Sequence, residues 1–170
     1  LPADAVVQSW RGAESLAAAA SAGHRAILSS GYYLDHLKPA SYHYAVDPLA
    51  GAAGALPADE RARILGGEAC TWSEYHSAEM IDGRVWPRAA AVAERLWSPA
   101  EVSDVDDLYR RLELASARLE WDGLRHRSNP AMMLRPSSRK PSPPFPGQPA
   151  PVILNILPNF GLTRGSRRWA

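Results

Sequence analysis

The chain is 170 residues long, 46% hydrophobic and 22% charged, and its net charge is +1. These values are typical of an ordinary globular protein with one sizeable core. No run of about 18 apolar residues occurs, which excludes a membrane-spanning helix. The sequence opens on Leu1-Pro2 without an initiator methionine or a signal-like pattern, so we expect it to begin within a longer protein.

The first 30 residues predict a strand, a helix and a second strand. Residues 5–10 form a short apolar run, residues 14–22 are rich in alanine, and Gly23 stands where a helix C-cap glycine would. Residues 24–30 form the second strand, which ends at a polar and aromatic loop. Such a βαβ unit builds a parallel sheet.

A third strand is predicted at Ile64-Leu65, where Gly66-Gly67 follow and no helical period appears before Trp72. We expect this strand to be buried, with glycines that allow close backbone approach. The preceding residues 36–63 look irregular apart from one or two helical turns at 57–63. A loop of this length is usually functional or disordered.

The residues after these glycines suggest a sugar pocket. In an extended segment Glu68, Cys70, Trp72 and Glu74 would share one face, because strand side chains alternate. An indole can cover the apolar face of a sugar ring, and a carboxylate can accept hydrogen bonds from its hydroxyls. Without further context, a core aromatic and a solvated acid are the commoner explanation. Cys70 is the only cysteine, which excludes an internal disulfide and a cysteine zinc site, and we expect a small buried hydrophobe.

Two helices are predicted next. Residues 86–97 have high helix propensity, with Pro87 in the first turn, and residues 98–101 have the form of a capping box. Apolar residues at three- and four-residue steps from Val105 predict an amphipathic helix through about Trp121. The charged residues on or beside its polar face are expected to be solvated: Arg110, Arg111, Glu113, Arg118 and Glu120.

The composition changes at Arg135. All 18 acidic residues precede it, so residues 1–134 carry a net charge of −5 and residues 135–170 carry +6. We therefore divide the chain into a folded part, 1–134, and a Pro-rich basic tail, 135–170, whose prolines disfavour stable structure. A frameshift or an unusual extension would each explain the change. The tail lacks interleaved aromatics or a recognisable binding module, so we expect no nucleic-acid partner.

Four motifs in this order resemble family 20 glycoside hydrolases, the β-N-acetylhexosaminidases. The stretch 66–74, Gly-Gly-Glu-Ala-Cys-Thr-Trp-Ser-Glu, resembles the eighth-strand signature, and 86–97 is similar to the helix after it. Residues 6–11 resemble the sixth strand and 28–35 the seventh. The resemblance implies an α/β fold, the C-terminal portion (about strands six to eight) of a (β/α)8 TIM barrel, whose active site lies at the carboxyl ends of its strands.

The resemblance also implies a retaining, substrate-assisted removal of terminal N-acetylglucosamine or N-acetylgalactosamine from glycans. In that chemistry the 2-acetamido oxygen of the substrate attacks the anomeric carbon, so the protein supplies no carboxylate nucleophile. A family aspartate orients the acetamido group, and the adjacent glutamate protonates the leaving oxygen and later activates water.

Five residues carry over from the family as substrate-binding groups. Trp10 and Trp72 would line the pocket around the acetamido group and the sugar ring. Tyr33 would donate its hydroxyl to the acetamido carbonyl oxygen. Asp35 and Glu74 would accept hydrogen bonds from the outer sugar hydroxyls.

The other polar residues of the motifs are expected to be structural. Tyr32 is assigned to the wall or core, and Glu68 to an inward hydrogen bond or ion pair. Arg88 and Glu94 are expected not to face substrate. The five histidines show no ligand spacing, so we expect no metal and no cofactor: His24, His36, His43, His76 and His126.

The family's catalytic Asp-Glu pair belongs to a fourth-strand motif that nothing in this sequence matches, and the sugar-gripping arginine is also missing. Both are expected upstream, so no catalytic residue is assigned within the chain. Three parallel strands cannot close a barrel, and we expect the isolated chain to fold poorly and to be inactive. The alternative is a non-catalytic carbohydrate-binding or partner-completing module. The family is often secreted, periplasmic or lysosomal, and the sequence leaves the compartment, the linkage and the sugar preference open.

Overall fold

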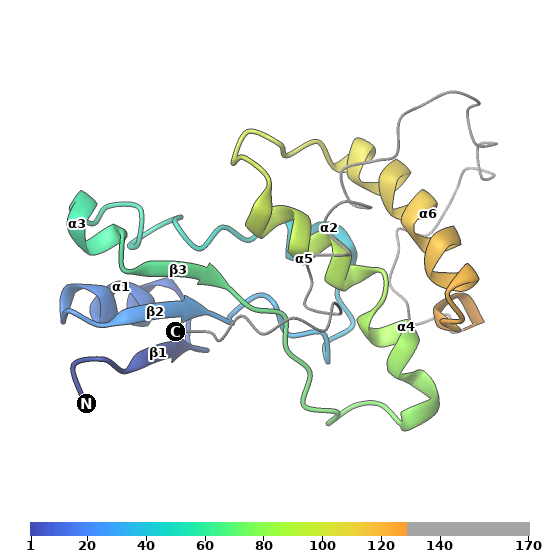
Figure 1. The fold of residues 1–170 in the computed structure, drawn as a ribbon, viewed down its shortest axis with the longest axis horizontal. Coiled ribbons are helices and arrows are strands. Elements are labelled where there is room, and N and C mark those ends of the chain that lie inside the picture. The colour runs from blue at the N-terminus through green and yellow to red at the C-terminus, as the bar shows by residue number, and fades with distance from the viewer. Residues whose placement is uncertain (129–170) are drawn as a thin grey trace.

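A computed structural model describes residues 1–128. Three parallel strands form one sheet in the order β1-β2-β3: β1 (Val6–Ser9), β2 (Arg25–Leu28) and β3 (Ile64–Gly67). The sheet lies at one end of the molecule, and the strands point toward a group of helices at the other end (Figure 1). The helices are α1 (Ala13–Ser21), α2 (Ala40–Tyr44), α3 (Ala58–Arg61), α4 (Ile81–Val85), α5 (Arg88–Trp97) and α6 (Val105–Trp121), with 3-10 turns η1 (Ala78–Met80) and η2 (His126–Ser128).

The β1–α1–β2 unit forms where the sequence predicts it. Gly23 follows α1 with a φ of 91°, a left-handed conformation that glycine adopts without a Cβ penalty. The α1 helix packs on one face of the sheet, where Leu16, Ala26 and Leu28 are buried in one hydrophobic cluster. This parallel βαβ unit sets the direction in which all the site-bearing loops leave the sheet.

The third strand is shorter and more exposed than expected. Leu65 is 52% exposed, so the prediction of a buried strand is wrong, because nothing within residues 1–128 covers that face of β3. The expectation of close approach is confirmed at Gly67. A Cβ there would lie 2.4 Å from Cε2 of Tyr32 and 2.9 Å from the Leu28 carbonyl oxygen. Gly67 therefore lets the Tyr32 ring pack against the strand.

The helices α2, α5 and α6 share a second core. It contains the buried residues Ala40, Tyr44, Ala90, Leu108 and Leu112. The apolar positions of α6 face it, as the three- and four-residue spacing predicts. The short alanine side chains of α5 let that helix lie close to its neighbours.

Several helix boundaries differ from the sequence expectation. Helices α2 and α4 were not predicted, since five-residue helices have little periodicity of their own. Trp86 is extended, as residues before proline tend to be, so α5 begins at Arg88 and Pro87 is its N-cap. The prediction of a capping box at residues 98–101 is wrong. Asp104 caps α6 instead, and its carboxylate accepts a hydrogen bond from the Asp107 N–H.

Two charged groups lie at the centre of the helical region. Arg88 and Glu94 are both completely buried, which fits their predicted structural role. Glu94 pairs with Arg111, whose side chain is only 13% exposed. The expectation that Arg111 is solvated is therefore wrong, because a buried carboxylate requires a charged partner.

No helix within residues 1–128 is long and apolar enough to cross a bilayer. The predicted Pro-rich tail, 135–170, lies outside the described residues.

Candidate functional site

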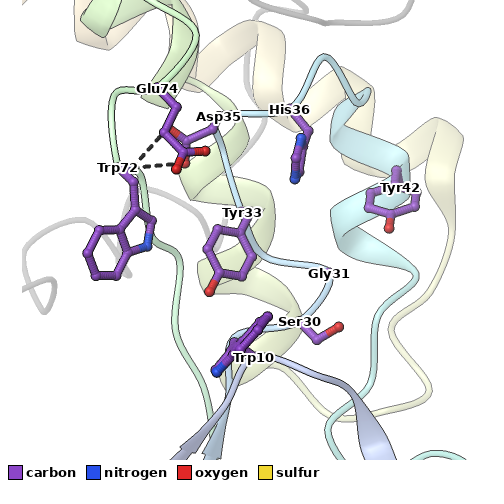
Figure 2. A pocket seen from close by; sticks show the side chains of 9 residues that line it. All are labelled: Trp10, Ser30, Gly31, Tyr33, Asp35, His36, Tyr42, Trp72 and Glu74. Carbon is purple, nitrogen blue, oxygen red and sulfur yellow. Dashed lines mark hydrogen bonds between the residues drawn. The ribbon is translucent and has the colours of Figure 1, made fainter.

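A cavity of about 550 Å³ opens beyond the carboxyl ends of the three strands. It brings together all five residues that the sequence nominated, from the loop after each strand (Figure 2). Its lining is Trp10, Ser30, Gly31, Tyr33, Asp35, His36, Tyr42, Trp72 and Glu74. In this view the two indoles flank the Tyr33 ring, and Asp35 and Glu74 are drawn above it (Figure 2).

The loops after β2 and β3 remain paired beyond the strands themselves. The Glu68 N–H donates to the Leu28 carbonyl at 3.0 Å, and the Cys70 N–H to the Tyr32 carbonyl at 3.3 Å. The Leu34 N–H then donates to the Cys70 carbonyl at 2.8 Å, and Tyr33 and Cys70 form an isolated parallel bridge. This extended ladder fixes the two loops that carry most of the cavity wall.

Asp35 is the most buried member of the site, at 2% exposure. Its carboxylate accepts hydrogen bonds from the Trp72 N–H at 2.9 Å and from the Thr71 hydroxyl at 2.9 Å. Burial acts to raise the pKa of Asp35, but these bonds and one from the Ser73 N–H outweigh it and lower the pKa below its usual value. Asp35 is therefore an ionised acceptor, and its position is set by the neighbouring loop.

Tyr33 stands half-buried in the middle of the cavity. Burial, followed by the effect of Cys70, raises the pKa of its phenol. The hydroxyl thus keeps its proton at neutral pH and can donate a hydrogen bond to a ligand carbonyl. Trp10 and Trp72 are 57% and 67% exposed, so both indoles present apolar faces to solvent beside this donor.

Glu74 reaches the cavity by a route that differs from the prediction. The strand ends at Gly67, and Ser73 has a φ of 59°, which breaks the alternation of an extended segment. Trp72 and Glu74 still line the same cavity, with Glu74 exposed. The prediction that Trp72 and Glu74 share one face of an extended strand is therefore wrong, although both side chains line the cavity.

Two further motif residues support the site from behind. Glu68 accepts hydrogen bonds from the Gln8 amide and, at 3.1 Å, from the Ser29 hydroxyl, which confirms its predicted inward hydrogen bond. Tyr32 is fully buried and donates to the Val46 carbonyl at 2.9 Å, as expected of a core residue. Cys70 is half-buried rather than fully buried, and burial raises the pKa of its thiol to about 11.

Arg88 holds the loop that carries Asp35. Its guanidinium donates to the carbonyl oxygens of Leu34 at 2.6 Å, His36 at 2.8 Å and Lys38 at 3.0 Å. Burial, together with nearby Arg84, lowers the pKa of Arg88 to about 10, so the group stays charged at neutral pH. This cation ties the loop after β2 to the start of α5.

The cavity also contains residues that sequence reasoning missed. Ser30, Gly31, His36 and Tyr42 line it, and Tyr42 comes from the unpredicted helix α2. Gly31 has a φ of 87°, and a Cβ there would lie 2.7 Å from Val46. A glycine after a predicted strand was a usable signal for this turn, but nothing in the sequence marked Tyr42.

The groups that line the cavity are suited to binding a ligand with an apolar ring face and peripheral polar groups. Within the described part of the chain no group of three or more histidine, cysteine, aspartate or glutamate side chains could hold a metal ion. The cavity instead offers two indoles, one phenol donor and two carboxylate acceptors. Such a set can stack on an apolar ring face while it hydrogen-bonds peripheral hydroxyl and carbonyl groups.

Comparison with known proteins gives the same family. The model of the glycosyl hydrolase family 20 catalytic domain matches residues 1–100. The β-hexosaminidase α subunit of Bos taurus is 40% identical over 118 residues, which are 64% of this chain and 22% of that protein. The β-hexosaminidase of Porphyromonas gingivalis is 36% identical over 144 residues, 74% of this chain and 18% of that protein. The chain thus spans about a fifth of the length of these relatives.

Solved structures agree. A chitobiase from Flavobacterium johnsoniae is 47% identical, with a TM-score of 0.67 over 71% of this chain and 19% of that one. An exo-β-N-acetylglucosaminidase from Vibrio harveyi, in complex with N-acetylglucosamine, is 26% identical, with a TM-score of 0.61 over 70% of this chain and 21% of that one. These neighbours indicate a TIM-barrel-type α/β fold, of which the described residues are a part. The chain therefore belongs to glycosyl hydrolase family 20, a family of glycoside hydrolases that includes the β-hexosaminidases.

Proposed function

We propose that this chain is the substrate-binding C-terminal part of a β-N-acetylhexosaminidase. Residues 1–134 supply about the sixth to eighth strands of the catalytic barrel and the loops that hold the sugar. The complete enzyme removes terminal, non-reducing N-acetylglucosamine or N-acetylgalactosamine from glycans. The observation that carries the proposal is the single cavity shared by Trp10, Tyr33, Asp35, Trp72 and Glu74.

Each side chain has a role that suits its chemistry. The indoles of Trp10 and Trp72 enclose the acetamido group and the sugar ring. The Tyr33 hydroxyl donates to the acetamido carbonyl, and Asp35 and Glu74 accept from the outer hydroxyls. The low pKa of Asp35 supports its role, since an ionised carboxylate is the stronger acceptor.

The reaction itself needs groups beyond this set. The acetamido oxygen forms a bond to the anomeric carbon while the bond to the leaving oxygen breaks, and a carboxylic acid gives that oxygen its proton. Water then opens the cyclic intermediate, and the same carboxylate takes the proton of that water. Tyr33 contributes by holding the acetamido oxygen near the carbon that it attacks. The catalytic Asp-Glu pair comes from the part of the barrel that precedes these strands.

A chimera tests the proposal. Residues 1–128 replace the segment that they match in the Flavobacterium johnsoniae chitobiase, and hydrolysis of p-nitrophenyl N-acetyl-β-glucosaminide is measured beside the isolated 170-residue chain. We expect turnover by the chimera and none by the isolated chain. A well-folded but inactive chimera would contradict the proposed function. Turnover by the isolated chain would show that the catalytic acid lies within it.

A further inference from the structure

His76 lies next to Asp35 but outside the set of residues that line the cavity. Its side chain is 1% exposed, and its Nδ1 atom is 4.0 Å from Oδ1 of Asp35. Nδ1 is also one of the buried side-chain atoms that make no hydrogen bond in the structure. A buried polar atom without a partner is destabilising, and this one faces the carboxylate that the proposed function assigns to sugar binding.

The hydrogen-bond directions around His76 restrict its protonation state. Its Nε2 atom makes a long, 3.5 Å contact with the Thr71 hydroxyl oxygen. That hydroxyl already donates its single proton to Oδ1 of Asp35 at 2.9 Å. Nε2 can therefore pair with Thr71 only as a donor. The neutral tautomer with a proton on Nε2 would point a bare Nδ1 lone pair toward the carboxylate, and the neutral tautomer with a proton on Nδ1 would leave Nε2 with no proton for Thr71. Only the imidazolium has an N–H on both sides.

We propose that His76 is a positioning residue for Asp35, whose protonated ring donates to the carboxylate through Nδ1 and to Thr71 through Nε2. A ring movement of about 1 Å brings Nδ1 within hydrogen-bond distance. The carboxylate is then held by Thr71, the Trp72 N–H and His76, with its remaining lone pairs directed to the cavity. This inference rests on the proposed function, in which Asp35 accepts hydrogen bonds from sugar hydroxyls.

The other titratable groups around this pair do not substitute for His76. Arg84 donates to the backbone carbonyl oxygens of Asp35 and Tyr75, and Arg88 to those of the loop after β2. The His36 ring faces Tyr33 and Tyr75, with centroids 6.3 and 6.0 Å away. The Cys70 thiol stays protonated, with a pKa raised to about 11 by burial and the nearby carboxylates. Glu74, the other carboxylate of the cavity, is exposed to solvent.

The titration of the Asp35 carboxyl carbon, followed by ¹³C NMR in the chitobiase chimera with that carbon labelled, tests the inference. We expect His76→Gln to raise the Asp35 pKa by about one unit, since it removes a positive charge some 4 Å away. His36→Gln is the matched control: it removes a histidine from the same cavity and should leave the Asp35 titration unchanged.

An Asp35 titration that His76→Gln does not move, or that both substitutions move equally, would overturn the proposal. An Asp35 pKa at the ordinary value in the unsubstituted, folded chimera would overturn it as well. A second measurement needs no substitution. We expect the ¹⁵N spectrum of the His76 ring at pH 5 to show protons on both nitrogens, and a neutral ring would overturn the proposal. Neither measurement uses a sugar, so their outcome is separate from the presence or absence of hydrolysis by the chimera.

Discussion

The sheet end and the helical end of this molecule differ in how completely their apolar side chains are buried. In the helical region, the apolar faces of α2, α5 and α6 meet in a closed core, and the buried charges of Arg88 and Glu94 have polar partners. At the sheet end, Leu65 on β3 and Val6 on β1 are 52% and 42% exposed. Both strands form the edges of the described sheet.

This difference in burial shows that the described residues cover the helical core with their own side chains but leave one face of the sheet uncovered. The helical core and the buried polar network brace the loops that carry Tyr33 and Asp35. The uncovered sheet face suits a surface that the remainder of a barrel would cover. We therefore expect substitutions in the helical region to cost far more stability than substitutions on the exposed side of the sheet.

The largest effect is expected from Arg88→Met. The substitution leaves the carbonyl oxygens of Leu34, His36 and Lys38 without their donor and should lower the free energy of unfolding by about 4 kcal/mol. Arg95→Met, on the same helix, is the control. Arg95 bonds the Pro99 and Val102 carbonyls in an exposed setting, so its loss should cost less than about 1 kcal/mol. Urea unfolding measures both, and equal costs would contradict the comparison.

The free energy of unfolding should depend on pH through His43, a residue of α2 that is completely buried. Burial lowers its pKa to about 4, and its Nδ1 bonds the Gly31 carbonyl at 2.7 Å. The unfolded chain takes up this proton at a pKa of about 6.5, so stability is full above that value and decreases as the pH falls toward 4. The expected loss is about 3 kcal/mol. His43→Gln should flatten this part of the pH profile, whereas an unchanged profile would exclude His43 as its source.

Glu94→Gln should have an intermediate effect. Glu94 is completely buried and pairs with Arg111, so the neutral side chain leaves a nearly buried guanidinium with one charged partner fewer. We expect a loss of about 2 kcal/mol in thermal or urea unfolding. Asp122→Asn removes an exposed partner of Arg118, 3.7 Å away, and should cost less than about 0.5 kcal/mol. Similar losses for both variants would show that burial does not distinguish the two ion pairs.

The smallest effect is expected at the sheet. Leu65→Ala removes a side chain that is already half exposed, so the cost should be below about 1 kcal/mol. Leu112→Ala, in the helical core, removes a completely buried leucine and should cost about 3 kcal/mol. A Leu65→Ala cost as large as that of Leu112→Ala would mean that the strand is covered after all.

Strong local patterns predicted much of this fold. The βαβ unit and α6 were predictable because their periodicity and glycine signals agree with the final packing. Helix α2 was not, because it depends on contacts distant in sequence. The Tyr44 hydroxyl donates to the Val102 carbonyl at 2.7 Å, 58 residues away. Arg111 was misassigned for the same reason, since its buried partner comes from another helix.

The candidate site shows the same division. All five residues that the motifs nominated line the cavity, because each follows directly from a strand end or a signature. No motif indicated Tyr42, because it reaches the cavity only through the position of helix α2 in the fold. The burial of Asp35 was also out of reach, since it depends on how the loops after β2 and β3 pair.

The most direct test of sugar binding in this cavity is the kcat/KM of the chitobiase chimera with Trp72→Ala. We expect a loss of about 100-fold, since the indole forms part of the wall that would enclose the sugar. Trp121→Ala, at a tryptophan that is 87% exposed and outside the cavity, should leave kcat/KM unchanged. Equal activity of the two variants would contradict the claim that this cavity binds the substrate.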